Sequence, residues 1–271
     1  MRSPARSGWI GILLSACDFG AGATDSGPVV VASVPSDESV GISRDGLLIA
    51  QVDRRLLPAS VNTRSVRVLS GVVREPLAVQ FDPVDVAIRA ELRGGRLLEP
   101  QVTYRLVIEG VVDLDHRAME VPFDATFRTA ATSAGRPPVE PVSFSEVLHL
   151  VVDRCAGGSC HGPAEAALGL DLSSAEAIAS TAIGVRSVQV SRGDLDSEGG
   201  RGSPVLTDLP IVDVVAGVGS PGNSYLLYKV LGDEHILGAV MPPSDSNRPA
   251  LSREEARMLS RWIQAGAPVE P

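Results

Sequence analysis

The hydrophobic periodicity of this chain changes at a proline-rich segment, and this change constrains the fold more than any other feature. Before the segment, apolar residues alternate with polar ones, as in Tyr104–Ile108. Residues 131–142 are rich in proline and small residues and have no apolar period, which is typical of a linker. Beyond them, apolar residues recur at helical spacing. The sequence therefore predicts two domains of different class, residues 28–130 and residues 143–271.

The first domain is predicted to be all-β. Runs with a period of two and one polar face are typical of strands in an antiparallel sandwich. Gly94 and Gly95 separate two such runs and indicate a turn. A domain of this length suits an immunoglobulin-like sandwich without its disulfide.

Three segments carry a resemblance to a known family. Pro35-Ser36-Asp37 stands near the start, Tyr104–Val112 forms a strand that opens on tyrosine, and Phe123–Thr129 forms a final Phe-x-Thr strand. In this order they resemble the immunoglobulin-like domain of many exported bacterial proteins. The resemblance implies a spacer or a protein-contact module.

The second domain is predicted to begin and end with amphipathic helices. The first helix has its apolar stripe at helical spacing and Ser145 as a candidate N-cap. In the last helix, Ser252 and Glu255 form a capping box, and Gly266 ends the helix. The expected stripes are Phe144, Leu148, Val151, Val152 and Cys155 in the first helix, and Ala256, Leu259, Trp262 and Ile263 in the last. We therefore expect an all-α domain.

The amino terminus has the pattern of an export signal. Residues 1–16 combine two arginines with a short apolar run, too short to span a bilayer as a mature helix. The run ends in small residues before Cys17, which resembles the lipobox of bacterial lipoproteins. This predicts a lipidated Cys17, a spacer over residues 17–27 and a membrane anchor. The alternatives are an ordinary signal peptide with a chance cysteine, or a buried apolar segment.

Cys155, Cys160 and His161 form the motif that carries chemistry. Covalent haem attachment needs two thiols a short loop apart and a histidine directly after the second. The spacing here is Cys-x4-Cys-His, two residues longer than usual, and two glycines inside the loop could accommodate the difference. The open alternatives are a local disulfide and another metal, although zinc would need further ligands.

The wider context of this motif resembles the c-type cytochrome-like domains of planctomycete and myxobacterial exported proteins. Matching segments are Leu168–Ser173, Ser220–Val230, Met241-Pro242-Pro243 and Leu251–Pro268, in that order. The resemblance implies one covalent haem c on the two cysteines, with iron bound by His161 and Met241. It also implies that the Trp262 helix crosses the Phe144 helix and covers one haem edge.

Two alternatives concern the second iron ligand. Met241, next to two prolines, could instead fill a gap in the core. His235 lies six residues upstream and is the main rival, although a lone loop histidine is expected to be exposed. We expect His149 to lie on the surface and His116 to be a structural turn residue.

The charge and the motifs together define the expected function. The net charge is −9 and no basic run occurs, so a nucleic-acid partner is not expected. We expect a multidomain protein, an all-β Ig-like sandwich followed by an all-α cytochrome c-like domain. It would be a lipid-anchored electron carrier of the bacterial cell envelope, not an enzyme, with an unknown redox partner. The alternative is a haem-free envelope lipoprotein with a Cys155–Cys160 disulfide that acts in binding or adhesion.

Overall fold

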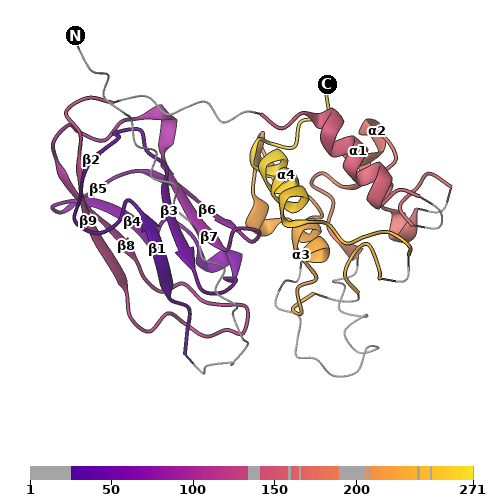
Figure 1. Ribbon diagram of the computed structural model, residues 1–271, viewed down its shortest axis with the longest axis horizontal. Helices are drawn as coiled ribbons and strands as arrows, with labels where there is room; N and C mark the ends of the chain where they lie inside the picture. Colours follow the sequence, from indigo (N-terminus) through magenta and orange to yellow (C-terminus); the bar gives the residue numbers. More distant parts are fainter. Residues whose placement is uncertain are drawn as a thin grey trace, which may run out of the picture.

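The computed structural model shows two halves that lie side by side, joined by the linker (Figure 1). The predicted signal peptide and Cys17 lie outside the residues that it describes. The described residues are 26–133, 141–157, 160–164, 166–188, 206, 208–236, 239–244 and 246–270.

The first half is a sandwich of a four-stranded and a five-stranded sheet. The strand orders are β1-β3-β7-β6 and β2-β9-β8-β4-β5, and every pairing is antiparallel except that of β2 with β9. The strands are β1 (Val30–Val34), β2 (Ser39–Ile42), β3 (Leu48–Val52), β4 (Val66–Ser70), β5 (Val73–Arg74), β6 (Leu77–Asp82), β7 (Ala87–Leu92), β8 (Thr103–Ile108) and β9 (Phe123–Thr129), with short 3-10 helices at Pro58–Ser60 and Arg93–Gly95.

The alternation of side chains explains the sandwich. In β8, Tyr104 and Leu106 are buried while Arg105 is exposed, because successive strand residues point to opposite faces. The Tyr104 ring stacks on Phe127 of β9 at a centroid distance of 5.7 Å. On the outer face, Arg105 pairs with Asp124. One apolar face per sheet thus builds the core between the two sheets.

The second half mixes helices with strands and irregular chain. The elements of this half are α1 (Phe144–Arg154), α2 (Ala175–Thr181), α3 (Tyr225–Leu231), α4 (Arg253–Gln264), β10 (Val214–Val215), β11 (Val218–Gly219) and 3-10 turns at Ala167–Gly169 and Pro221–Asn223. Strands β10 and β11 pair antiparallel as a hairpin.

The expected fold class, a sandwich followed by an all-α cytochrome c-like domain, is wrong. The described residues form three sheets, one of them in the second half, and the helices there are short. The stretch between α2 and α3 is the reason. Pro210 and Pro221 lack the amide hydrogen that a helix needs, and Gly184 and Gly217 adopt positive φ angles of 70° and 78°. Clear helical periodicity in the sequence was confined to the two ends of this half.

The two end helices pack against each other. The Phe144 ring of α1 stacks on Trp262 of α4 at a centroid distance of 6.3 Å. The buried stripe of α1 includes Val147, whereas Val152, expected inside, is 38% exposed. The N-cap is Ser143 and not Ser145, because Glu146 is then at the third helical position and accepts a hydrogen bond from the Ser143 amide at 3.2 Å.

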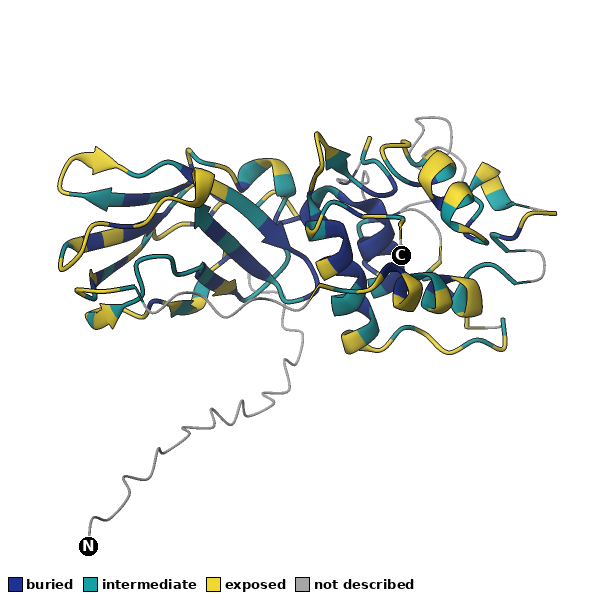
Figure 2. Cartoon of the chain, turned by 90° about the horizontal axis from the view of Figure 1, so that it is seen from above, coloured by how far each residue is buried: buried dark blue, intermediate teal, exposed yellow. Residues whose placement is uncertain are grey.

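The two halves share buried surface (Figure 2). Val84, from the sandwich, belongs to the core formed by the four helices. Gly222 lies so close to β6 that a Cβ there would be 2.7 Å from the Phe81 carbonyl oxygen. The Gln80 side-chain amide donates to the Gly219 carbonyl at 3.2 Å. This packing sets the position of α3, which follows directly and carries one wall of the site described next.

Candidate functional site

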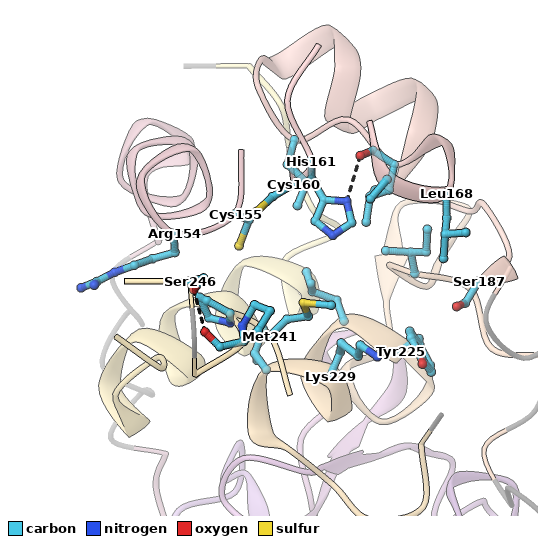
Figure 3. A pocket seen from close by; sticks show the side chains of 18 of the residues that line it. Arg154, Cys155, Cys160, His161, Leu168, Ser187, Tyr225, Lys229, Met241 and Ser246 are labelled. Atoms are coloured by element: carbon cyan, nitrogen blue, oxygen red, sulfur yellow. Dashed lines mark hydrogen bonds between the residues drawn. The ribbon is translucent and has the colours of Figure 1, made fainter. Parts of the chain in front are cut away.

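A cavity of about 470 Å³ opens between three segments of the second half (Figure 3). They are the loop after α1, helix α3 and the loop that contains Met241. Its volume lies in the range of small-molecule and cofactor sites. The lining residues are Arg154, Cys155, Cys160, His161, Ala167, Leu168, Leu170, Leu172, Ser187, Val188, Ile211, Tyr225, Leu226, Lys229, Val230, Met241, Pro242, Pro243 and Ser246.

The cysteine loop is held by backbone hydrogen bonds at both ends. The Cys155 amide donates to Val151 at 2.8 Å and so continues the last turn of α1. The His161 amide donates to the Cys155 carbonyl at 3.0 Å, and its own carbonyl accepts from Leu172 at 2.8 Å. Gly157 lies against the Arg248 guanidinium, since a Cβ there would be 1.7 Å from Nη2. These hydrogen bonds bring the two ends of the loop together, and Cys155, Cys160 and His161 line the cavity.

The imidazole of His161 is oriented by its backbone partner. Its Nδ1 lies 3.1 Å from the Leu170 carbonyl oxygen. A carbonyl only accepts, so Nδ1 carries the hydrogen and Nε2 keeps its lone pair. In Figure 3 the second ring nitrogen faces into the cavity, on the side of Met241. Burial lowers the pKa of His161, which keeps the ring neutral at pH 7. This is the state in which imidazole binds a metal.

The two cysteines are half-buried, and both thiols are free in the structure. Both line the cavity with His161. Burial raises the pKa of Cys155 to about 11, so this thiol stays protonated at neutral pH. It is therefore a weak ligand for a bare metal ion but keeps the S–H bond that addition to a double bond requires.

Met241 reaches the opposite wall of the cavity. Its amide donates to the Lys229 carbonyl at 3.1 Å, which ties the loop to α3. Figure 3 shows its sulfur between the loop and the imidazole of His161. The tertiary structure thus brings to one cavity the four side chains that the sequence analysis had grouped as haem ligands, Cys155, Cys160, His161 and Met241.

His235, the rival ligand, does not line the cavity. It was expected to be exposed, but its side chain is only 18% exposed. Its Nδ1 lies 2.8 Å from Asp233, and its Nε2 lies 3.0 Å from Asp115 of the sandwich. Both ring nitrogens are therefore occupied by carboxylates.

Three further predictions concern His149, His116 and the helix that contains Trp262. His149 and His116 are exposed, and His116 adopts a positive φ in its turn. Helices α1 and α4 are in contact through Phe144 and Trp262, but no residue of α4 lines the cavity, so Trp262 does not cover it. Its indole instead donates to the Pro268 carbonyl at 2.8 Å.

Sequence reasoning missed Lys229 and Tyr225, which line the α3 wall. Lys229 is the one lysine of the chain and is only 6% exposed. Its ammonium lies 5.9 Å from the centroid of the Tyr225 ring. Burial raises the pKa of Tyr225 to about 12, so its hydroxyl remains a donor. The chain has a single lysine, and this was the sequence feature that could have drawn attention to Lys229.

In the described part of the chain, no group of three or more His, Cys, Asp and Glu side chains lies in an arrangement that could hold a metal ion. No helix among those residues is both long and apolar enough to cross a bilayer.

The comparisons with known proteins identify no family for this chain. No family model matches it. No curated protein matches it. Similar solved structures include the N-terminal part of the bacterial S-layer protein SbsC, which is 13% identical with a TM-score of 0.30 and covers 38% of this chain and 23% of its own.

Two copper-resistance proteins are also similar. PcoC of Escherichia coli, described as methionine-rich, is 17% identical with a TM-score of 0.29 and covers 38% of this chain and 97% of its own. CopC of Methylosinus trichosporium OB3b is 16% identical with a TM-score of 0.30 and covers 41% and 99%. Likenesses this weak carry no argument about function.

Proposed function

We propose that this chain holds one covalently attached haem in the cavity and carries electrons at the bacterial cell envelope. One observation carries the proposal. Met241, 80 positions beyond His161 in the sequence, lines a single cavity of cofactor size together with Cys155, Cys160 and His161. Two thiols, an imidazole and a thioether form the set of side chains that a c-type haem requires.

The donor chemistry fits this group. Each thiol would add across one vinyl group, so that sulfur bonds to one carbon and the thiol hydrogen goes to the other. No oxidant or reductant is consumed in that addition. His161, with Nδ1 held by Leu170, offers Nε2 to the iron, and Met241 offers its sulfur from the opposite wall. When bound, haem supplies a reversible one-electron change at iron.

The residues that surround the haem would tune the reduction potential of its iron. The cavity wall is largely aliphatic, with Leu168, Leu172, Ile211, Leu226 and Val230 among its residues. An apolar shell limits access of water and favours the iron state with less charge. A methionine ligand raises the reduction potential relative to a second histidine. If His161 and Met241 both bound the iron, the site would suit electron transfer rather than substrate binding at the iron.

The envelope location rests on the amino-terminal sequence. Removal of residues 1–16 and lipidation of Cys17 would anchor the chain to a membrane. The sandwich would then separate the cavity from the bilayer or contact a redox partner. No nucleic-acid partner is proposed for a chain with a net charge of −9.

The test is haem content. The full chain with its signal is produced in a bacterial host that has haem-attachment machinery and is purified from its membranes. We expect a band that retains peroxidase staining on a denaturing gel, and an intact mass that includes one haem and a lipidated amino terminus. Cys155→Ala with Cys160→Ala should abolish the stain, whereas His149→Gln on the exposed face of α1 should not. A colourless wild-type protein whose mass is two hydrogens short would overturn the proposal and support the disulfide alternative.

A further inference from the structure

Leu168 has a backbone conformation and an exposure that both disfavour leucine. Its φ and ψ angles are 54° and 25°, in the left-handed region, where the Cβ of an L-residue lies too close to a carbonyl oxygen. The residue is 60% exposed. It belongs to none of the apolar clusters that the described residues form. Packing within the chain therefore does not account for a leucine at this position.

The turn that contains Leu168 is anchored to the cysteine loop on both sides. The Ala167 amide donates to the Cys160 carbonyl at 2.9 Å. On the other side, the Leu170 carbonyl oxygen lies 3.1 Å from Nδ1 of His161. A backbone that is held at both ends can keep a conformation that would otherwise relax. The turn therefore fixes where the Leu168 side chain lies relative to the imidazole.

The Leu168 side chain lies at the cavity. It is one of the lining residues, and Figure 3 shows it on the same side as His161, with Lys229 and Met241 on the opposite side. Val188 lines the same cavity, is 53% exposed and is also outside the apolar clusters of the described residues. Exposed aliphatic side chains in a concave site are typical of surfaces that a ligand buries.

We propose that Leu168 is a ligand-binding residue, whose side chain becomes buried against the apolar ring system of the cofactor that His161 binds. This inference rests on the proposed function, in which the cofactor is haem. Removing an aliphatic side chain from water is favourable, and the gain scales with the area buried. That gain, made on binding, offsets the cost of a left-handed backbone at a leucine.

This role predicts that the stability of the fold and the affinity for the cofactor respond in opposite directions to one substitution. Leu168→Gly accommodates the positive φ without a steric cost, so the free apoprotein should be at least as stable as wild type. The same substitution removes the apolar contact and should weaken binding about tenfold, the size expected when most of the burial of one leucine is lost.

The experiment measures both quantities on the same preparations. The full mature chain is produced without haem-attachment machinery, and the apoprotein is titrated with iron protoporphyrin IX while absorbance reports binding. Urea unfolding of the free apoproteins measures stability. Leu168→Asn also accommodates a left-handed backbone but is polar, so it should behave like Leu168→Gly. Leu168→Met keeps an apolar side chain and should retain most of the affinity.

Ala216→Gly is the matched control for the backbone. Ala216 also has a positive φ, of 51°, and it is exposed in the turn between β10 and β11. It does not line the cavity. The substitution relieves the same kind of backbone conformation and should leave the affinity for the porphyrin unchanged.

The outcomes distinguish this inference from the proposed function. A Leu168→Gly apoprotein that is clearly less stable than wild type would show that the leucine serves the fold, and would overturn the inference. Glycine and asparagine variants that bind the porphyrin as tightly as wild type would also overturn it and leave the haem site standing. A wild-type apoprotein that does not bind the porphyrin would overturn both.

Discussion

The Nε2 atom of His235 lies 3.0 Å from Oδ1 of Asp115, a contact that joins the loop after α3 to the sandwich. On its other side, His235 contacts Asp233 at 2.8 Å, and Asp233 pairs with Arg55 of the sandwich at 2.7 Å. The four side chains form an ionic cluster between the halves. Asp233 and His235 lie between α3 and Met241 in the chain, so the cluster ties this side of the cavity to the sandwich.

This cluster should make stability depend on pH. The hydrogen bond to Asp233, and then that to Asp115, raise the pKa of His235 to about 9, above its ordinary value of roughly 6.5. A raised pKa in the folded state stabilises the fold fully below about pH 6.5, and the contribution is lost as pH rises through about 9. We expect a loss of about 1–2 kcal/mol in unfolding free energy over that window, allowing for solvent screening.

Urea unfolding at pH 6, 7.5 and 9 checks this. His235→Gln should be less stable than wild type at pH 6 and approach it at pH 9. His149→Gln, an exposed histidine on α1, should follow wild type at each pH. Parallel curves for wild type and His235→Gln would contradict the expectation.

The contributions of Asp233 and Arg55 to the free energy of unfolding should be coupled, because the two side chains form an ion pair. The Asp233 side chain is 3% exposed, so it relies on its charged partners. Asp233→Asn should cost about 2–4 kcal/mol of unfolding free energy, because Arg55 and His235 lose an ionised partner. Combined with Arg55→Met, the loss should be smaller than the sum by about 1 kcal/mol. Chemical denaturation of the four proteins measures this coupling, and strictly additive losses would refute it.

Gly222 should be intolerant of a side chain. Its Cβ would meet the Phe81 carbonyl at 2.7 Å, and backbone of β6 has little freedom to retreat. Gly222→Ala should destabilise the protein by about 1–3 kcal/mol through overpacking between the halves. Val218→Ala, at a position 60% exposed in β11, should change little. Thermal and urea unfolding measure both, and a Gly222→Ala protein as stable as wild type would show that the contact is looser.

Met241 should control the reduction potential if haem is present. Met241→Ala should alter the oxidised absorption spectrum and lower the potential by on the order of 0.1 V, since axial ligands tune haem potentials over roughly 0.8 V. Met258→Ala on α4 is the matched control, because Met258 is partly buried but does not line the cavity. Spectroelectrochemistry measures both variants. An unchanged potential in Met241→Ala would mean that another group binds the iron.

The sequence predicted secondary structure correctly where interactions between residues close in the chain determine it. The alternation over β8 indicated a strand with Tyr104 inside, and the structure has it. The capping box predicted at Ser252 and Glu255 is present, with the Glu255 amide 3.2 Å from the serine hydroxyl. Strand alternation and helix caps involve residues within a few positions of one another, so the sequence carries the whole signal.

Predictions failed where residues from other segments determine which side chains are buried. The stripe expected in α1 included Val152 and not Val147, whereas in the structure Val147 is buried and Val152 is exposed. The expectation that His235 is exposed was wrong because Asp115, which covers it, is 120 positions away in the chain. The all-α class expected for the second half was inferred from helical periodicity at its two ends, and the residues between α2 and α3 form the hairpin of β10 and β11 instead.

By itself the sequence determined that Cys155, Cys160 and His161 belong to one short loop, because they lie within seven consecutive residues. It also determined which runs alternate with a period of two. Only the tertiary structure decided that Met241 faces His161 and that Lys229 lines the same cavity from α3. Those contacts depend on how α3 packs against the sandwich, and packing is a sum of many weak non-local interactions that no single segment encodes.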